Sequence, residues 1–186
     1  GTNTGMTVAE GANDNVITNL MLNEGDPDDD GIELTYEMTS VVSSGTLRLN
    51  GTELLINDTF TQADIDAGLL SYDHDGSETV IDSFSFSLAD GGEDSATAAT
   101  GTFTITVAPV NDGPVVSAPG SALTATEQVA LSIEGTGFGV TDSDEGDSGA
   151  TAKISVGEGT LTILAGDSGV SVDTGNGSSA VTVTGT

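Results

Sequence analysis

Apolar and polar residues alternate along several short stretches of this 186-residue chain. Alternation with a period of two is typical of a β-strand that buries one face. The stretches are separated by Gly, Asn, Asp and Ser, the residues that turns favour. The pattern predicts half-buried strands at 46–49, 84–88, 102–107, 160–164 and 180–184.

Helical patterns are nearly absent. No apolar stripe with a spacing of 3.6 residues runs over ten or more positions, and Thr, Val, Ile and Gly, which are poor or middling helix formers, are abundant. One helical turn is expected within residues 61–68, where Thr61 can cap it and Gly68 can end it. Many short strands joined by turns predict an all-β sandwich.

The charge of the chain excludes several kinds of partner. Thirty Asp and Glu residues face two Lys and Arg residues, which gives a formal net charge of −28. We expect no nucleic-acid partner and no electrostatic docking on lipid, because both surfaces are anionic. No stretch approaches the length of an apolar membrane span and none has the layout of a signal peptide. We therefore expect no membrane insertion and no export signal within these residues.

Groups that could carry catalysis are sparse. The chain has no Cys, no Trp and one His. His74 lies in the run YDHDG, and no Ser in a nucleophile-elbow context accompanies it, so we interpret it as a structural turn residue. Glycoside hydrolysis would need two acids beside a sugar platform, but the aromatic residues are assigned to strand patterns or to the core. We expect no enzymatic activity.

Three short patterns occur twice, and matching positions of the two copies are offset by 114 to 117 residues. The pairs are 7–10 with 124–127, 26–28 with 142–144, and 45–47 with 159–161. A nearly constant offset indicates two copies of one module of about the size of an Ig-like sandwich. We predict one repeat at 1–110 and a second at 111–186. Residues 108–114 contain two prolines and form a short, stiff connector.

The run FTQADIDAGLLSYDHDGSETVIDSFSFSLADG, followed by ITVAPVNDGP, resembles the cadherin-like repeats related to the chondroitin sulfate proteoglycan repeat. Repeats of this family occur in tandem in very large bacterial surface and secreted proteins. The second repeat is similar to the first part of a cadherin-like or bacterial Ig-like repeat from RTX-type adhesins. The resemblance implies tandem seven-stranded Greek-key sandwiches, with calcium held at the junctions between them.

The residues support Ca²⁺ by a separate argument. Calcium takes six to eight oxygen ligands from carboxylates, Asn side chains and backbone carbonyls. Clustered Asp residues repel one another, by roughly 1 kcal/mol for a close pair in water, and this chain has almost no basic residues to neutralise them. Zinc is the weaker candidate, because the chain has one His and no Cys.

Strand direction and the resemblance together predict the calcium ligands. Antiparallel strands would place Asp82 at the connector end of the first repeat and Asp90 at the far end, and the resemblance places Glu10 beside Asp82. A complete junction with one or two ions would then take Glu10, Asp82, Asn111, Asp112, Asp142 and Asp144. Half of an upstream junction would take Asp26, Asp28 and Asp90, and half of a downstream junction would take Glu127.

Other acidic residues have plainer interpretations. Asp29 and Asp30 are expected to face solvent, and Asp64 and Asp66 to cap or flank the helical turn. An isolated Asp-x-Asp loop is usually a solvated turn. The repeat of the 26–28 spacing at 142–144 is what favours calcium at those two loops.

We predict that the chain is a pair of calcium-rigidified repeats from a large extracellular, adhesin-type protein, secreted or at the cell surface and bacterial in origin. It would serve cell or matrix adhesion through a homotypic, cell-surface or glycan partner, or act as an extender. The alternative is a carbohydrate-binding repeat attached to a secreted polysaccharide-degrading enzyme. The repeat offset also aligns the final residue near position 61 of the first repeat. The second repeat is therefore expected to be truncated at its C-terminal end and open to strand exchange.

Overall fold

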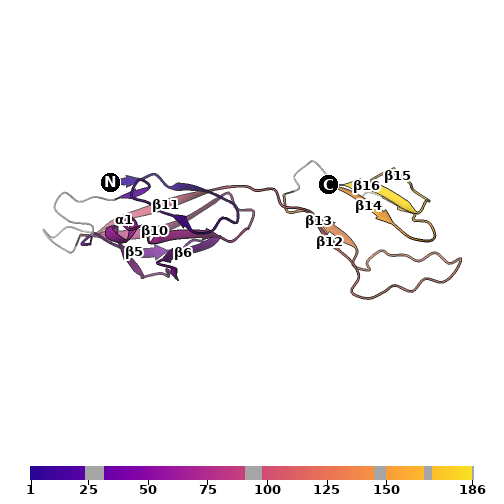
Figure 1. The fold of residues 1–186 in the computed structure, drawn as a ribbon, viewed down its shortest axis with the longest axis horizontal. Helices are drawn as coiled ribbons and strands as arrows, with labels where there is room; N and C mark the ends of the chain where they lie inside the picture. Colours follow the sequence, from indigo (N-terminus) through magenta and orange to yellow (C-terminus); the bar gives the residue numbers. More distant parts are fainter. Residues whose placement is uncertain (24–31, 91–97, 145–149, 166–168, 186) are drawn as a thin grey trace. The chain divides into compact units, whose positions relative to one another are not determined.

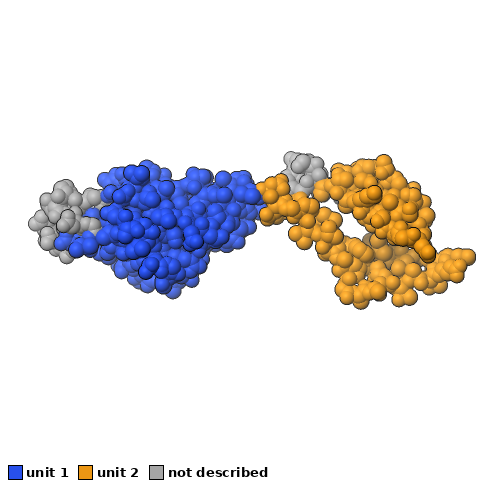
Figure 2. All heavy atoms as spheres, viewed as in Figure 1, with its two compact units in different colours: residues 1–110 blue, residues 111–186 orange. Residues whose placement is uncertain are grey.

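The structure of the chain is a computed structural model that describes residues 1–23, 32–90, 98–144, 150–165 and 169–185 (Figure 1). The chain divides into two compact units, Gly1–Val110 (unit 1) and Asn111–Thr186 (unit 2), which Figure 2 shows in different colours. No helix in the described parts of either unit is long and apolar enough to cross a membrane.

Unit 1 is built from short strands and one helical turn. In chain order these are β1 (Thr2–Asn3), β2 (Met6–Ala9), β3 (Asn15–Val16), β4 (Leu22–Asn23), β5 (Thr35–Ser40), β6 (Gly45–Leu49), β7 (Thr52–Glu53), β8 (Thr59–Thr61), α1 (Gln62–Asp66), β9 (Leu70–His74), β10 (Ile81–Ala89) and β11 (Ala99–Ala108).

Two sheets of unit 1 face each other. One has the strand order β2-β11-β10-β5-β8 and the other β3-β9-β6-β7, while β1 and β4 form a separate pair. Strand β2 runs parallel to β11, and the remaining pairs in these sheets are antiparallel. Buried residues from both sheets join one hydrophobic cluster. Unit 1 is therefore the all-β sandwich that the alternating pattern predicts.

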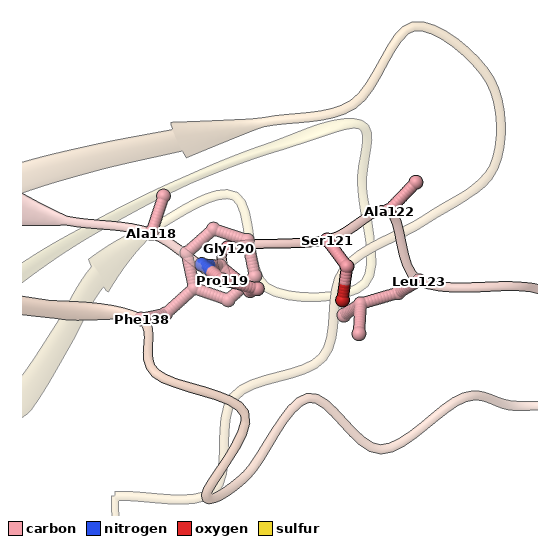
Figure 3. Close-up of a pocket in the computed structure, with 7 residues that line it drawn as sticks. All are labelled: Ala118, Pro119, Gly120, Ser121, Ala122, Leu123 and Phe138. Carbon is pink, nitrogen blue, oxygen red and sulfur yellow. The ribbon is translucent and has the colours of Figure 1, made fainter.

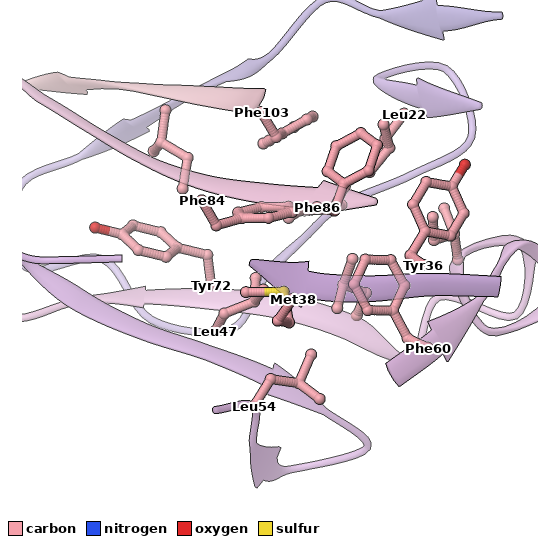
Figure 4. Packing of buried hydrophobic residues seen from close by; sticks show 14 of the residues in the cluster. Leu22, Tyr36, Met38, Leu47, Leu54, Phe60, Tyr72, Phe84, Phe86 and Phe103 are labelled. Carbon is pink, nitrogen blue, oxygen red and sulfur yellow. The ribbon is translucent and has the colours of Figure 1, made fainter. Parts of the chain in front are cut away.

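Aromatic rings fill the centre of the sandwich (Figure 4). Tyr36 stacks on Phe60 with ring centroids 4.9 Å apart and meets the ring of Phe86 edge-on at 5.1 Å. Phe84 stacks on Phe103 across the β10–β11 pair at 5.2 Å. Each aromatic pair contributes roughly 0.5–1.5 kcal/mol beyond the effect of the area it buries. The few aromatic residues of unit 1 therefore stabilise it by being gathered in one cluster.

Strand β10 shows how the alternation becomes structure. Phe84 and Phe86 are buried, whereas Ser83 and Ser85 on the opposite face are partly exposed. The strand begins three residues before the predicted stretch, so Asp82 belongs to the same inward-facing series as the two phenylalanines. That position determines the role of Asp82 described below.

The expected helical turn is confirmed as α1. The Thr61 hydroxyl accepts a hydrogen bond from the backbone N–H of Asp64 at 3.2 Å, and the Asp64 carboxylate accepts one from the Thr61 backbone N–H at 2.8 Å. Gly68 follows with φ of +70° and donates its N–H to the carbonyl of Ile65. The left-handed backbone at Gly68 ends the helix, as predicted.

Unit 2 contains β12 (Val115–Ser117), β13 (Gly139–Thr141), β14 (Ala150–Ser155), β15 (Ser171–Thr174) and β16 (Ala180–Gly185). Strands β12 and β13 pair with each other, and β14-β16-β15 form a three-stranded antiparallel sheet. Among the described residues of this unit, Val181 is the one buried hydrophobic side chain. Unit 2 therefore lacks a core comparable to that of unit 1 in the parts that the structure describes.

Four of the five predicted strands are confirmed, as β6, β10, β11 and β16. The prediction of a strand at 160–164 is wrong, since Leu161 makes only an isolated bridge with Ser178. The Asn176 side-chain amide accepts a hydrogen bond from the backbone N–H of Ile163 at 2.9 Å and donates one to its carbonyl at 3.1 Å. The Asn176 side chain thus forms hydrogen bonds with the Ile163 N–H and carbonyl, which a neighbouring strand would otherwise bind.

Candidate metal centre

Acidic side chains gather at the end of unit 1 where β11 finishes at Ala108, which we call the connector end. Ala9 pairs with Ala108 in the parallel β2–β11 ladder, so the following residue, Glu10, lies at this end. Asp82 pairs with Ile105 in the antiparallel β10–β11 ladder and lies near the same end. The strand register therefore brings Glu10 and Asp82 to one end of the sandwich, as strand direction and the resemblance suggested.

Glu10 and Glu78 form an acidic pair at the connector end. A carboxylate oxygen of Glu10 lies within 4.8 Å of one of Glu78. Glu10 is partly buried and Glu78 is exposed. The Glu10 backbone N–H donates to the carbonyl of Ala108 at 2.9 Å, and its carboxylate accepts a hydrogen bond from the backbone N–H of Val110 at 3.1 Å. Two like charges are thus held close together at the start of the connector.

Glu78 is absent from the ligands predicted from the sequence. It lies in the loop between β9 and β10, after Asp73, Asp75 and Gly76. Asp75 and Glu78 lie on either side of Gly76 in this loop, and acidic residues beside a glycine are a pattern that can collect carboxylates. That spacing is the signal that could have identified Glu78.

Asp82 is held entirely by protein donors. It is 4% exposed, and its two oxygens accept five hydrogen bonds of 2.8 to 3.1 Å, from the backbone N–H groups of Ser43, Ser44 and Ser83 and the hydroxyls of Ser43 and Tyr72. A metal ion at this carboxylate would have to displace those donors. The structure therefore gives Asp82 the role of a buried anchor that joins β10 to the loop before β6.

The same hydrogen bonds set the charge state of Asp82. Burial pushes its pKa upward, but the hydrogen bonds from Ser43, Ser44, Ser83 and Tyr72 outweigh burial and hold the pKa below its ordinary value. Burial, with the adjacent carboxylate, raises the pKa of Tyr72. Asp82 is consequently ionised and Tyr72 protonated across the neutral range.

The one arginine of the chain is engaged away from the Glu10–Glu78 pair. The Nε of Arg48 lies 2.7 Å from an Asp73 carboxylate oxygen, and the backbone N–H of Asp14 donates to the other oxygen at 2.7 Å. The Arg48 contact, helped by the Asp14 hydrogen bond, lowers the pKa of Asp73. The other basic residue, Lys153, belongs to β14 in unit 2.

Predicted ligands also meet within unit 2. The backbone N–H of Asp112 donates to the Asp144 carboxylate, and the Asp144 N–H donates to the Asp142 carboxylate at 3.4 Å. The Asn111 side chain donates to the carbonyl of Asp112 at 2.6 Å. Four predicted metal ligands thus form one group in unit 2. Two of them lie at the start of the unit and two lie in its 142–144 loop.

The remaining predicted ligands are dispersed. Asp90 follows the last residue of β10 and lies at the opposite end of that strand from Asp82. Asp26 and Asp28, its predicted partners, lie outside the described residues, as do Asp29 and Asp30. Glu127 is exposed in the turn closed by the hydrogen bond from Val129 to Thr126. The structure therefore says nothing of an upstream group around Asp90.

One aromatic residue departs from the expectation that all aromatic rings are buried or in strands. Phe138 is 56% exposed, directly before β13. Its ring faces Pro119 in a hollow of unit 2 (Figure 3). The hollow has a volume of about 380 Å³ and is lined by Ala118, Pro119, Gly120, Ser121, Ala122, Leu123 and Phe138.

The fold defines unit 1 as a β-sandwich module with acidic residues at its connector end. A family model described as cadherin-like matches residues 1–107, and the chain belongs to this cadherin-like family. This confirms the cadherin-like resemblance found in the sequence.

Similar curated proteins belong to the extracellular matrix. The chain is 33% identical over 123 residues to the human extracellular matrix organizing protein FRAS1. The matched region is 60% of this chain and 3% of that protein. It is 41% identical over 76 residues to extracellular matrix protein 3 of Lytechinus variegatus, covering 41% of this chain and 2% of that protein. Human FRAS1-related extracellular matrix protein 2 is 37% identical over 86 residues, covering 46% of this chain and 3% of that protein. The chain thus spans a very small part of the length of these relatives.

Proposed function

We propose that this chain is a pair of calcium-binding repeats of a long extracellular protein, which serve attachment in a matrix or at a cell surface or act as an extender. Membership of the cadherin-like family and the extracellular matrix relatives support an extracellular location and a non-enzymatic role. The chain has 30 acidic and two basic residues, which gives a net charge of −28. This excess of negative charge favours the binding of cations.

The observation that carries the proposal is the Glu10–Glu78 pair. Two carboxylate oxygens within 4.8 Å of each other repel by about 1 kcal/mol in bulk water and by several kcal/mol near a protein surface. A divalent cation bound between the two carboxylates would turn this repulsion into attraction.

The donor chemistry fits calcium better than zinc. The side chains gathered at the connector end and in the 112–144 group of unit 2 offer carboxylate and amide oxygens, which are hard ligands suited to Ca²⁺. The one histidine is buried with both ring nitrogens hydrogen-bonded. We propose Glu10 and Glu78 as ligands in unit 1, and Asn111, Asp112, Asp142 and Asp144 as ligands in unit 2. We leave out Asp82 because its carboxylate oxygens already accept five hydrogen bonds.

A thermal melt in calcium and in chelator tests the proposal. A ligand that binds only the folded chain stabilises it by about 2.7 kcal/mol at 100 times its dissociation constant, and extracellular modules bind calcium at about 10⁻⁴ to 10⁻³ M. We expect the melting temperature to rise in millimolar calcium, with magnesium as the matched control. Identical melting curves in chelator and in about 10 mM calcium would remove the calcium proposal.

The partners of the protein are part of the same proposal. We propose a homotypic or cell-surface partner, supported by the exposed apolar side chains of unit 2, among them Val115, Val116 and Phe138. The RTX-type adhesin, the bacterial source, the truncation of unit 2 and an ion shared by both repeats stay predictions.

A carbohydrate-binding role is the second candidate, and the hollow beside Phe138 favours it. An exposed aromatic ring next to small residues (Figure 3) offers a face on which a sugar ring can stack. Binding of neutral polysaccharides that is lost in Phe138→Ala and kept in Phe138→Trp would support this role. Absence of glycan binding together with calcium-dependent self-association would favour the matrix role.

A further inference from the structure

His74 is a buried polar residue at the end of β9 whose hydrogen bonds join separate loops. The side chain is 3% exposed and follows the inward-facing Leu70 and Tyr72 in the alternation of β9. Its Nδ1 accepts two backbone hydrogen bonds, from the N–H of Gly11 and the N–H of Gly76, both at 3.1 Å. A nitrogen that accepts hydrogen bonds carries no hydrogen, so the ring is the tautomer with its hydrogen on Nε2. Nε2 then donates to the Thr79 hydroxyl at 3.0 Å.

The two loops that meet on His74 are those that carry the Glu10–Glu78 pair. Gly11 directly follows Glu10, and the segment between Gly76 and Thr79 contains Glu78. The His74 backbone adds a third link, because its N–H donates to the carbonyl of Ala12 at 2.9 Å. One side chain therefore fixes both segments relative to strand β9.

The hydrogen bonds of His74 hold the two loops together against the electrostatic repulsion between Glu10 and Glu78. The two carboxylates repel each other, and loops without attachment would relax by moving them apart. His74 is held by the β6–β9 ladder, where its register partner is Gly45, so it provides a rigid support for both loops. Partners in the second shell that orient metal ligands typically change metal affinity by about 10–100-fold when they are removed.

We propose that His74 is the positioning residue of the connector-end cation site, which uses its Nδ1 to hold the loops of Glu10 and Glu78 at the spacing that a divalent cation requires. This inference rests on the proposed calcium function and deepens it. His74 contributes no ligand atom, because both ring nitrogens are engaged by Gly11, Gly76 and Thr79.

Two substitutions at His74 separate the acceptor from the rest of the ring. His74→Asn places its Oδ1 two bonds from Cβ, as Nδ1 is in histidine, and this oxygen can accept both backbone hydrogen bonds. His74→Leu fills a similar volume with no acceptor. Calcium affinity of the full chain is measured by isothermal titration, and the melting temperature of each variant in chelator reports the fold.

We expect His74→Leu to weaken calcium binding by about 10-fold or more and His74→Asn to stay within about threefold of the unsubstituted chain, since the conservative variant restores the acceptor. Tyr36→Phe is the control for general destabilisation, because it removes a buried 2.7 Å hydrogen bond to Gln62 in another part of unit 1. Its calcium affinity is expected to be unchanged.

The outcomes distinguish this inference from the function on which it rests. Equal calcium affinity in the unsubstituted chain and in His74→Leu would overturn the role of His74 and leave the calcium function standing. An equal loss in His74→Asn and His74→Leu would also overturn it, because the acceptor would not be the cause. An unsubstituted chain that binds no calcium would overturn the calcium function itself.

Discussion

Single residues at the connector end show that the direction in which a side chain points decides its role. Asp82 and His74 both occupy inward-facing positions of their strands, in the same alternation as Phe84 and Tyr72. A polar residue in such a position is buried and must be hydrogen-bonded. The interpretation of His74 as structural agrees with this geometry. Strand direction places Asp82 at the end of its strand, and the alternation of β10 adds that its carboxylate faces inward.

Asp82→Asn is expected to destabilise unit 1 by about 2–4 kcal/mol. The amide nitrogen would face at least one of the hydrogen-bond donors that now point at the carboxylate, such as the Ser44 N–H and the Tyr72 hydroxyl. Urea unfolding followed by tyrosine fluorescence measures this effect, since both tyrosines, Tyr36 and Tyr72, belong to unit 1. A loss below about 0.5 kcal/mol, typical of surface positions, would contradict the anchoring role.

The same variant has a defined pH dependence. The folded-state pKa of Asp82 is lowered, so its contribution is fully present above the unfolded pKa of about 3.9 and is lost as the pH falls through the folded value. The stability difference between the unsubstituted chain and Asp82→Asn should therefore stay constant from about pH 5 to 7 and shrink below about pH 4. A difference that grows on acidification would contradict the lowered pKa.

Among the elements, short strands with strict alternation could be predicted from the sequence, and the helical turn could be predicted from its capping residues. The stretch at 160–164 alternates equally well but forms no strand, because the Asn176 side chain binds the backbone of Ile163. Contacts of that kind join residues 13 positions apart and leave no periodic trace. The acidic loop around Gly76 marks Glu78 as a candidate ligand, but its approach to Glu10 depends on how two loops fold back on His74, which the sequence pattern does not record.

Strand β6 begins with a residue that must be glycine. A Cβ on Gly45 would lie 2.2 Å from the carbonyl oxygen of Asp73 and 2.7 Å from the Tyr72 ring. We expect Gly45→Ala to lower the stability of unit 1 by about 3 kcal/mol, because β6 and β9 would have to separate. Gly113→Ala is the matched control, since a Cβ there meets nothing within 4 Å. Equal urea midpoints for the two variants would show that β6 and β9 do not approach so closely.

At the scale of the whole chain, the two units differ in how much apolar surface they bury. In the described parts of unit 1, sixteen buried residues form the core cluster, whereas Val181 is the one buried hydrophobic residue in the described parts of unit 2. Repetition of short motifs predicts two related modules, but such motifs by themselves say little about how completely a core is enclosed.

Amide hydrogen exchange on the dilute full chain should reflect this difference. Residues 84–88 and 102–107 are expected to exchange through global unfolding of unit 1 and to be strongly protected. Residues 150–155 and 180–184 are expected to exchange at least about tenfold faster, because few apolar contacts oppose their opening. Equal protection in the two regions would show that unit 2 is as well packed as unit 1.

We propose that a calcium ion binds between Glu10 and Glu78 at the connector end. Equilibrium dialysis with radioactive calcium tests it most directly, on the unsubstituted chain, on Glu10→Gln with Glu78→Gln, and on Glu37→Gln with Glu53→Gln. The last pair is the matched control, because it removes the same charge from exposed residues of β5 and β7. We expect the variant with both Glu10 and Glu78 replaced to lose at least one bound ion per chain at millimolar calcium, while the control keeps the full number. Equal numbers of bound ions in all three proteins would contradict it.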